Sequence, residues 1–465
     1  MPAEDMTVPS RSAPAALLGG DQPVSSPSDQ PVLSPGDEIE LVAGEVANGG
    51  WCVARLDGSG PVVFVRHTLP GERIRARITE VTARFARADA IQILAPAAGR
   101  VEPPCPYAHP GGCGGCDWQH ASLPAQRELK AVVVRQQLRR IAGIEWPVTV
   151  EPLPGDAPDD TPDGPGPGPG LGWRTRVTFA VRPDGVAGLR GHRSHQVAEI
   201  GDCLIAHPRI RDLGVPRRRW PRARSVTAAT GTGGPERAVI VTGGRPPADP
   251  AQLAAETVIG QARGRTTVVR GRPFLLQQAA GRSWRVSAAG FWQVHPALAD
   301  VLATAVLEAL RPQPGDTALD LYCGAGLFTG VLAAAVGPDG AVTGVEMDRT
   351  AVRDARRNLR GMPWATVYQG DAGQILARRD LAPARLTVLD PPRAGVSRDV
   401  LGHLVRSAPG LTGQRRIAYV SCDPATLARD IALLLPHGWR LESLRAFDAF
   451  PMTHHIECLA VLAAA

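Results

Sequence analysis

The chain has 465 residues and a net charge of +6, and its 44% hydrophobic and 21% charged residues are those of a globular protein. This length exceeds what one hydrophobic core holds, so two or three domains are expected. No apolar run approaches the roughly 18 residues of a membrane helix, and the first residues lack a secretory signal, which predicts a cytoplasmic protein without membrane attachment.

The positive charge of the chain is almost entirely arginine, because Lys130 is the only lysine. Arginine suits phosphate and base-plane contacts better than lysine does. A GC-rich genome that favours arginine codons nevertheless explains most of this bias.

Residues 1–34 are rich in Pro, Ser, Ala and Asp, and they are predicted to form a disordered leader. Residues 35–97 are expected to form a small OB-like β-barrel, a fold that often binds nucleic acids. Arginines outnumber acids in the second half of this module, which fits RNA binding and a solvated surface equally well. The expected strands, separated by Gly-rich turn signals, are 38–43, 50–57, 61–65, 73–81 and 85–94.

Three cysteines follow in glycine-rich loops, at Cys105, Cys113 and Cys116. A fourth ligand must come from elsewhere in the chain, and Cys203 is the obvious candidate. Four thiolates fit either a zinc site or an iron–sulfur cluster, and spacing alone does not separate the two. Free thiols and a redox-active Cys-x-x-Cys are the lesser alternatives.

Residues 98–290 are expected to form a β-rich central domain around these cysteines. A helix is predicted at 123–143, with Lys130 and several arginines on a polar face that suits phosphates or simply solvent. Two stretches, about 152–170 and 215–235, are interpreted as loose insertions. The expected strands of this domain are 174–181, 186–190, 238–242, 266–269 and 285–287.

Residues 291–465 show a regular alternation of strands and helices. This order is typical of a doubly wound α/β domain with a parallel sheet. The expected strands are 317–321, 341–346, 367–369 and 386–390, and the expected helices are 296–310, 326–335 and 349–360.

The glycine turn Asp320-Leu-Tyr-Cys-Gly-Ala-Gly326 follows a strand and opens a helix, which indicates close approach of a ligand to the backbone. Glu346 ends the next strand, where an acid can accept both hydroxyls of a ribose. A dinucleotide site would want a third glycine where Thr329 stands, so S-adenosylmethionine is favoured over a dinucleotide.

Two acids follow the later strands of the same domain. Asp371 comes after the third strand, where adenine would lie, although a turn residue is the simpler interpretation. Asp390-Pro-Pro-Arg393 follows the fourth strand, and its prolines fix a rigid turn beside the expected sulfonium.

Cys422 stands at the end of a short apolar strand, 417–421, in the region where open α/β sheets bind ligands. A single cysteine is more often core filling than a nucleophile. Its neighbours in the sequence decide between the two.

Three motifs in order resemble the uracil-5 RNA methyltransferase family: Asp390-Pro-Pro-Arg-x-Gly, Tyr419-Val-Ser-Cys-Asp-Pro-Ala-Thr, and Phe450-Pro-Met-Thr-His-His-Ile-Glu457. The likeness extends back through Phe291-x-Gln293 and the cysteines. It reaches Thr68-Leu-Pro-Gly-Glu72, which resembles the TRAM domain, an RNA-binding module. The resemblance covers nearly everything except the leader and the two insertions.

This resemblance implies methyl transfer from S-adenosylmethionine to carbon 5 of a uridine in RNA. Cys422 would add to carbon 6 so that carbon 5 becomes nucleophilic, and Glu457 would remove the carbon-5 proton. The implied cofactor ligands are Gln293, Tyr322, Glu346, Asp371 and Asp390. The implied ligands of a [4Fe-4S] cluster, with zinc as the alternative, are Cys105, Cys113, Cys116 and Cys203.

Ribosomal RNA is favoured over transfer RNA, because the iron–sulfur and TRAM parts accompany the ribosomal branch more often. No protein partner is implied, and a monomer is expected. Two other functions stay open. A cytosine-5 RNA methyltransferase uses a similar cysteine adduct but has different flanking motifs, and a catalytically idle RNA-binding or assembly factor would not need an intact site.

The chain departs from the family pattern at three places. The gap of seven residues between Cys105 and Cys113 is longer than the five expected of iron–sulfur members. Leu327 stands where some members have a polar cofactor contact. Asp423 replaces the asparagine that usually follows the nucleophile, which puts the reading of the uracil edge in doubt.

Overall fold

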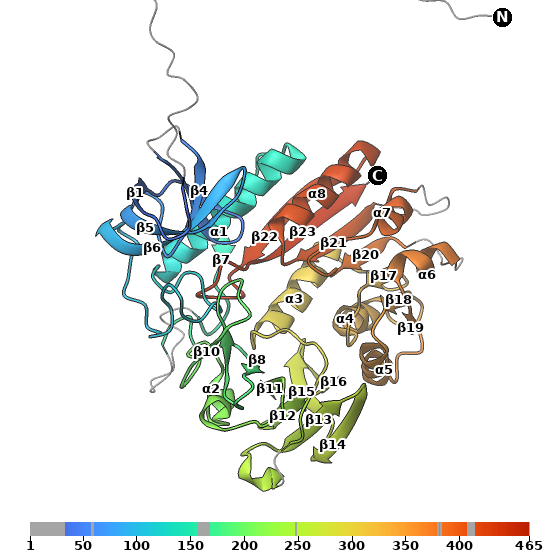
Figure 1. The fold of residues 1–465 in the computed structure, drawn as a ribbon. Coiled ribbons are helices and arrows are strands. Elements are labelled where there is room, and N and C mark those ends of the chain that lie inside the picture. Colours follow the sequence, from blue (N-terminus) through green and yellow to red (C-terminus); the bar gives the residue numbers. More distant parts are fainter. Residues whose placement is uncertain are drawn as a thin grey trace, which may run out of the picture.

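The computed structural model describes residues 33–56, 60–156, 168–246, 249–378, 381, 384–406 and 414–464 (Figure 1). The expected leader up to residue 32, and residues 157–167 of the first expected insertion, lie outside the described residues. The described strands form three larger sheets and one hairpin. In this part of the chain, no helix has both the length and the apolar character needed to cross a bilayer.

The N-terminal module is a six-stranded sheet in the order β1-β5-β6-β4-β3-β2. Its strands alternate buried and exposed residues, so that in β5 the side chains of Ile74, Ala76 and Ile78 fill the core between outward arginines. The five predicted strands are confirmed, and β2 is an addition. Their bounds are β1 Glu38–Val42, β2 Val46–Ala47, β3 Trp51–Arg55, β4 Val62–Arg66, β5 Arg73–Val81 and β6 Phe85–Ala95.

Helix α1 (Leu123–Gln137) begins at Ser122, whose hydroxyl accepts the Ala125 amide, and continues into a π-helical turn at Leu138–Ala142. Its apolar side packs on α8 (Pro424–Leu434) of the C-terminal region, rather than within the central domain where the sequence analysis placed it. The prediction of a solvent- or phosphate-facing basic side was wrong at Lys130. The Lys130 side chain is fully buried, with a buried carboxylate, Asp448, opposite it.

The central sheet has seven strands in the order β10-β9-β8-β11-β12-β13-β14. Its middle strand, β11 (Ser225–Thr230), lies inside the stretch 215–235, so the interpretation of that stretch as a loose insertion was wrong. Val226 and Ala228 alternate into the core, and the arginine-rich segment before them is anchored by Trp220, whose indole N–H donates to the Val215 carbonyl at 2.9 Å. The other elements are β8 Arg176–Val181, β9 Ala187–Arg190, β10 Val197–Glu199, α2 Pro208–Arg211, β12 Arg237–Thr242, β13 Thr257–Ala262 and β14 Arg265–Arg270, with 3-10 turns at Val215–Arg217 and Pro250–Gln252.

A hairpin joins the central sheet to the C-terminal domain. It consists of β15 (Phe274–Ala279) and β16 (Arg282–Ser287), and β16 packs on α5 (Arg349–Asn358). The Asn358 side chain fixes this contact, because its amide group accepts from the Arg285 backbone N–H at 2.9 Å and donates to the Arg285 carbonyl at 3.1 Å.

The C-terminal sheet has eight strands in the order β19-β18-β17-β20-β21-β23-β22-β7. Every described residue of β23 is buried, as expected of a strand covered on both faces. The bounds are β7 Val150–Glu151, α3 Leu298–Leu310, β17 Thr317–Leu321, α4 Leu327–Val336, β18 Ala341–Glu346, β19 Ala365–Gln369, α6 Ala372–Arg378, β20 Leu386–Leu389, α7 Arg398–Val405, β21 Arg415–Ser421, β22 Arg440–Phe447 and β23 Glu457–Ala464, with a 3-10 turn at Leu435–His437.

The predicted doubly wound α/β fold is confirmed. The chain passes outward from β17 to β18 and β19, then returns to place β20 on the other side of β17, and all four strands are parallel. The strand order therefore reverses between β17 and β20. Ligands of such sheets bind in the crevice beyond the strand ends at this reversal.

Candidate active site

The glycine turn after β17 holds a carboxylate in place at the tip of β18. Tyr322, Gly324 and Gly326 all have positive φ values, of 70°, 53° and 89°, so the backbone doubles back sharply. The Gly324 amide donates to Glu346 Oε2 at 3.0 Å, and the Asp348 amide donates to Oε1 at 2.7 Å. Glu346 is therefore fixed with its carboxylate at the mouth of the crevice, where an acid suits ribose hydroxyls.

A group of buried carboxyls lies behind this turn. Asp320 is fully buried and accepts the Thr329 hydroxyl at 2.6 Å, while its Oδ1 has no hydrogen-bond partner among the described residues. Burial raises the pKa of Asp320 to about 7, and the charge of Glu346 adds to this. Burial likewise raises the pKa of Asp390 to about 7, with Asp320 and Glu346 contributing. Such a cluster suits a cationic ligand, and S-adenosylmethionine carries a sulfonium.

Two other predicted cofactor residues lie on nearby loops. Asp371 follows β19, accepts the Gln374 amide at 3.0 Å, and interacts electrostatically with Tyr322, whose pKa is raised mainly by burial. Gln293 is half-buried in the segment between β16 and α3, where the Val294 carbonyl accepts both the amide and the hydroxyl of Thr175. The contacts of the described residues do not join Gln293 to the other four.

Cys422 and Glu457 meet at the same edge of the sheet. Cys422 directly follows β21, which ends at Ser421, and Glu457 is the first residue of β23. These strands are antiparallel, with Ser421 opposite Cys458, so the start of β23 lies beside the end of β21. Segments 35 residues apart in the chain thus bring a thiol and a carboxyl together at the carboxyl edge of the sheet.

Burial favours the protonated form of both groups. Burial raises the pKa of the Cys422 thiol to about 11, with Glu457 and Asp390 adding to the effect. Burial also raises the pKa of the fully buried Glu457 carboxyl well above its ordinary value, again with Asp390 contributing. The Arg393 guanidinium opposes both shifts, since it lowers the pKa of Cys422 and of Glu457.

Arg393 belongs to the pocket around the thiol, and the sequence analysis gave it no role there. The pocket is lined by Cys422, Arg393, Lys130 and residues of the segment before β23. The Arg393 guanidinium lies 3.3 Å from the His455 ring nitrogens. The signal that could have found it is its place in the Asp390-Pro-Pro-Arg turn, one strand from Cys422.

His454, His455 and Ile456 line this pocket, and the segment 448–456 that carries them is held by the N-terminal half of the chain. The Asp117 and Trp118 amides both donate to the Met452 carbonyl at 3.0 Å, and His454 Nδ1 lies 2.6 Å from Asp117. Lys130 donates to Asp448 Oδ1 at 2.5 Å and to the Phe450 carbonyl at 3.1 Å. Its standing as the only lysine was the available signal that this residue differs from the surface arginines.

Asp423, which follows Cys422 where the family usually has an asparagine, caps helix α8. Its Oδ1 accepts the backbone amides of Ala425 and Thr426 at 3.0 and 2.9 Å. An asparagine oxygen makes the same bonds, so the substitution preserves the cap. The charge of Asp423 is therefore directed at the helix start, where the dipole favours an anion.

The four predicted metal-binding cysteines converge in one region. Burial is the main cause that raises the pKa of Cys116, and the thiols of Cys203, Cys113 and Cys105 raise it further. These three thiols therefore lie near Cys116. All are free thiols, and no set of three or more described His, Cys, Asp or Glu side chains is arranged to hold a single metal ion. Trp173 packs beside Cys116 and Cys203, and its buried indole N–H has no partner among the described residues.

The parallel sheet, the glycine turn, the acid at the tip of β18 and the reversal of strand order define an S-adenosylmethionine-dependent methyltransferase. A family model described as a methyltransferase domain matches residues 312–386. The model described as tRNA (Uracil-5-)-methyltransferase matches residues 382–465, and the TRAM domain model matches residues 34–91.

Several relatives extend over nearly the whole chain. An RNA methyltransferase of Streptomyces coelicolor, described as uncharacterized, is 49% identical and spans 91% of this chain and 92% of its own. A 23S rRNA (uracil(1939)-C(5))-methyltransferase of a Shewanella species (strain MR-4) is 32% identical over 86% of this chain and 91% of its own. The chain therefore belongs to the uracil-5 RNA methyltransferase family and is an S-adenosylmethionine-dependent RNA methyltransferase.

A solved structure has the same fold. The tRNA (uracil-54, C5)-methyltransferase of Pyrococcus abyssi, in complex with S-adenosyl-L-homocysteine, superimposes with a TM-score of 0.67 at 23% identity. The match covers 91% of this chain and all of that chain. The family and the fold confirm the predicted methyltransferase and TRAM parts.

Proposed function

We propose that this enzyme methylates carbon 5 of a uridine in ribosomal RNA through a covalent bond between Cys422 and carbon 6. The observation that carries this mechanism is the register of β21 and β23, which sets Glu457 beside Cys422 at the crevice. The pair supplies a nucleophile and a base of suitable chemistry at one edge of the sheet.

In the proposed reaction, the Cys422 thiolate adds to carbon 6, and the electrons of the carbon 5–carbon 6 double bond move onto the carbon-4 oxygen. Carbon 5 of this enolate then takes the methyl group that S-adenosylmethionine supplies. The Glu457 carboxylate removes the carbon-5 proton, the double bond re-forms, and the thiolate leaves. Arg393 favours both required anions, because it lowers the pKa of each.

Ribosomal RNA is the substrate we infer, with transfer RNA as the alternative. The relative from Shewanella is a 23S rRNA methyltransferase and is 32% identical over most of both chains. The solved tRNA methyltransferase is 23% identical and supports the fold alone. The N-terminal module supports an RNA substrate of either kind, because TRAM domains accompany RNA-modifying enzymes.

We also propose that Cys105, Cys113, Cys116 and Cys203 hold a [4Fe-4S] cluster, with zinc as the alternative. What supports this proposal is that the thiols of Cys203, Cys113 and Cys105 all raise the pKa of Cys116, and that Trp173, whose indole N–H has no partner among the described residues, packs in the same cluster as two of the four. Anaerobically purified protein should show the brown absorption of thiolate-bound iron. Colourless protein that contains zinc would overturn the assignment.

The decisive test of the mechanism is covalent trapping. A ribosomal RNA transcript containing 5-fluorouridine has no carbon-5 proton to lose, so the methylated adduct should remain attached to the protein and migrate slowly in a denaturing gel. Cys422→Ala should abolish this band. Cys52→Ala, which removes a buried thiol of the N-terminal module, is the matched control and should retain it. An adduct that survives Cys422→Ala would refute the mechanism.

A further inference from the structure

Strand β16 and helix α5 lie on the far side of the molecule from the N-terminal module (Figure 1), and four arginines lie on these elements or on segments beside them. Arg272 precedes β15, Arg285 lies on β16, and Arg357 and Arg360 lie on and just after α5. We call this group the β16–α5 ridge. Burial lowers the pKa of Arg285, and the positive charges of Arg357, Arg272 and Arg360 lower it further, so these three lie close enough to act on Arg285.

The ridge has almost no compensating negative charge. In the described chain, none of the four forms an ion pair within 4 Å, whereas Arg237 and Arg445 each contact a glutamate at 3.0 Å or less. The acid near Arg285 is Asp354, which is 6% exposed and whose Oδ2 accepts the Ser287 amide at 2.7 Å. Like charges held together without partners raise the free energy of the folded protein, and a bound polyanion removes that cost.

The geometry of the ridge suits phosphate rather than a single small anion. The Arg285 guanidinium lies 3.4 Å from the centre of the Phe274 ring, which holds its planar group in a fixed orientation. The other three side chains are exposed along neighbouring elements, and Arg360 borders a shallow hollow beside Met362. Planar guanidinium groups spaced along a surface match successive phosphates, each of which can accept two hydrogen bonds.

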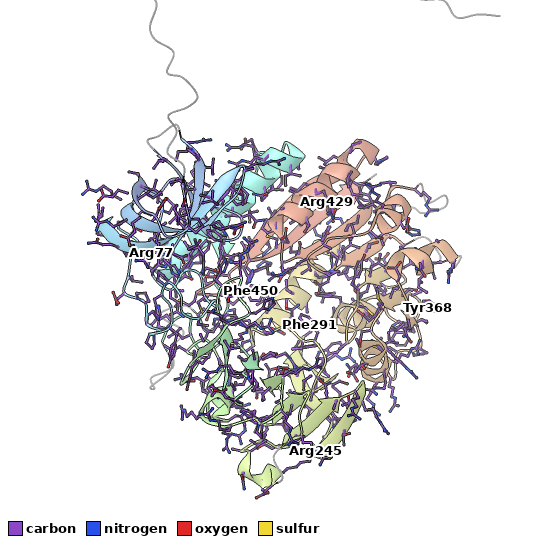
Figure 2. All side chains as sticks on the ribbon, in the orientation of Figure 1. Arg77, Arg245, Phe291, Tyr368, Arg429 and Phe450 are labelled. Atoms are coloured by element: carbon purple, nitrogen blue, oxygen red, sulfur yellow. The ribbon has the colours of Figure 1, made fainter. Side chains whose placement is uncertain are left out.

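The ridge also connects to the active site. The Arg353 guanidinium, next along α5, donates to the Ser287 hydroxyl at 3.1 Å, and Ser287 ends β16. The chain then leads through the exposed Phe291 to Gln293, one of the proposed cofactor residues. Figure 2 shows Phe291 near the middle of the molecule, between the central and C-terminal sheets.

We propose that the β16–α5 ridge binds the sugar–phosphate backbone of the substrate RNA, outside the target nucleotide. This inference rests on the proposed action on RNA, and it assigns the RNA a second anchor far from the N-terminal module. The target uridine then lies between two basic surfaces, which orients the strand across the Cys422 pocket. Because the contacts are to phosphate, the ridge contributes affinity and position rather than sequence selectivity.

The test is the salt dependence of RNA binding. A triple variant, Arg272→Gln, Arg357→Gln and Arg360→Gln, keeps Arg285 on Phe274 and removes exposed charge. Each lost phosphate contact should flatten the slope of log K against log salt by about 0.7–0.9, so the variant should lose about two to three units of slope. Its affinity for a ribosomal RNA transcript at low salt should fall at least about tenfold by the same effect.

The matched control removes three exposed arginines at the amino edge of the C-terminal sheet, Arg311→Gln, Arg406→Gln and Arg440→Gln, with the same change in net charge. Its slope should stay within about half a unit of that of the unmodified protein, because a distant charge releases few counterions. Equal slopes for the two triple variants would refute the proposal that the β16–α5 ridge contacts RNA. If the unmodified protein methylates no uridine in the transcript, the proposed function fails instead, whatever the slopes.

Discussion

At the residue scale, the protonation of Cys422 depends on burial and on the charges of its neighbours, first among them Glu457. The Asp390 charge raises the pKa of both the Cys422 thiol and the Glu457 carboxyl, so each added negative charge makes the next more costly. Glu457 raises the pKa of Cys422, and Arg393 lowers the pKa of both groups.

Replacing Glu457 by Gln should stop the reaction after methyl transfer. Without a base for the carbon-5 proton, the thiolate cannot leave, and ordinary uridine-containing RNA should then accumulate as a protein adduct. Turnover should fall at least about 100-fold, the usual contribution of a positioned base. Glu442→Gln, on the neighbouring strand β22, is the control and should turn over normally. Near-normal turnover of Glu457→Gln would remove this residue from the mechanism.

Replacing Lys130 by Met should lower the free energy of unfolding of the protein substantially. The Lys130 side chain is 0% exposed and Asp448 only 2%, so the variant leaves a buried carboxylate facing only the more distant Arg127, at 3.9 Å. Breaking one partner of a buried pair costs about 3–5 kcal/mol. Urea unfolding measures this loss, and adding Asp448→Asn should recover part of it. Equal loss in the single and double variants would show that packing, not charge, decides the site.

At the element scale, the loop 448–456 connects the N-terminal half of the chain to the pocket around Cys422. Asp117→Ala removes the carboxylate that lies 2.6 Å from His454 and 3.4 Å from Arg66. We expect faster amide hydrogen exchange in residues 450–456 and slower adduct formation at Cys422, with exchange in β17 unchanged. Unchanged exchange in the loop would show that the Met452 carbonyl bonds alone hold it.

Local patterns predicted most elements, because the alternation of apolar and polar residues and the glycine turns can be recognised from neighbouring residues. The strand after which Cys422 stands, and the strand that ends at Glu346, were both found in this way. Strand β11 was missed because arginines and glycines flank a run, Ser225–Thr230, whose burial depends on strands β8 and β12 on either side of it.

Long-range pairings were beyond local patterns. Nothing near Val150 indicates that β7 joins the edge of the C-terminal sheet beside β22. Lys130 likewise looked like part of a basic helix face, because its partner Asp448 is 318 residues away. The sequence named more residues of the candidate site than contacts of the surrounding fold, because the site motifs resemble those of a known family. The positions of Arg393 and Lys130 beside Cys422 were found only in the assembled structure.

At the scale of the whole molecule, the N-terminal module, the cysteine segment and the methyltransferase domain meet around one loop. The Trp118 indole N–H donates to the Gly50 carbonyl at 3.1 Å, and the next contacts from this segment reach Met452 and His454. These contacts connect the N-terminal module, through the cysteine segment, to the wall of the Cys422 pocket.

The buried carboxyls make ligand stabilisation of the whole fold depend on pH. The folded-state pKa values of Asp320 and Asp390 are about 7, above the ordinary value of 3.8, so the folded protein binds more protons than the unfolded chain in this window. Their contribution to the free energy of unfolding is therefore lost as pH rises from about 4 to about 7. Above pH 7 the site holds uncompensated negative charge that a cationic ligand relieves.

S-adenosylmethionine should consequently raise the melting temperature more than S-adenosylhomocysteine does, because only the former carries a sulfonium. The excess should grow from pH 5.5 to pH 8, as Asp320 and Asp390 lose their protons. Scanning fluorimetry at matched ligand saturation measures it, and Asp390→Asn should shrink both the excess and its pH dependence. An excess that is the same at both pH values would mean that the carboxyls do not sense the ligand charge, and that hydrogen bonding to Glu346 dominates binding.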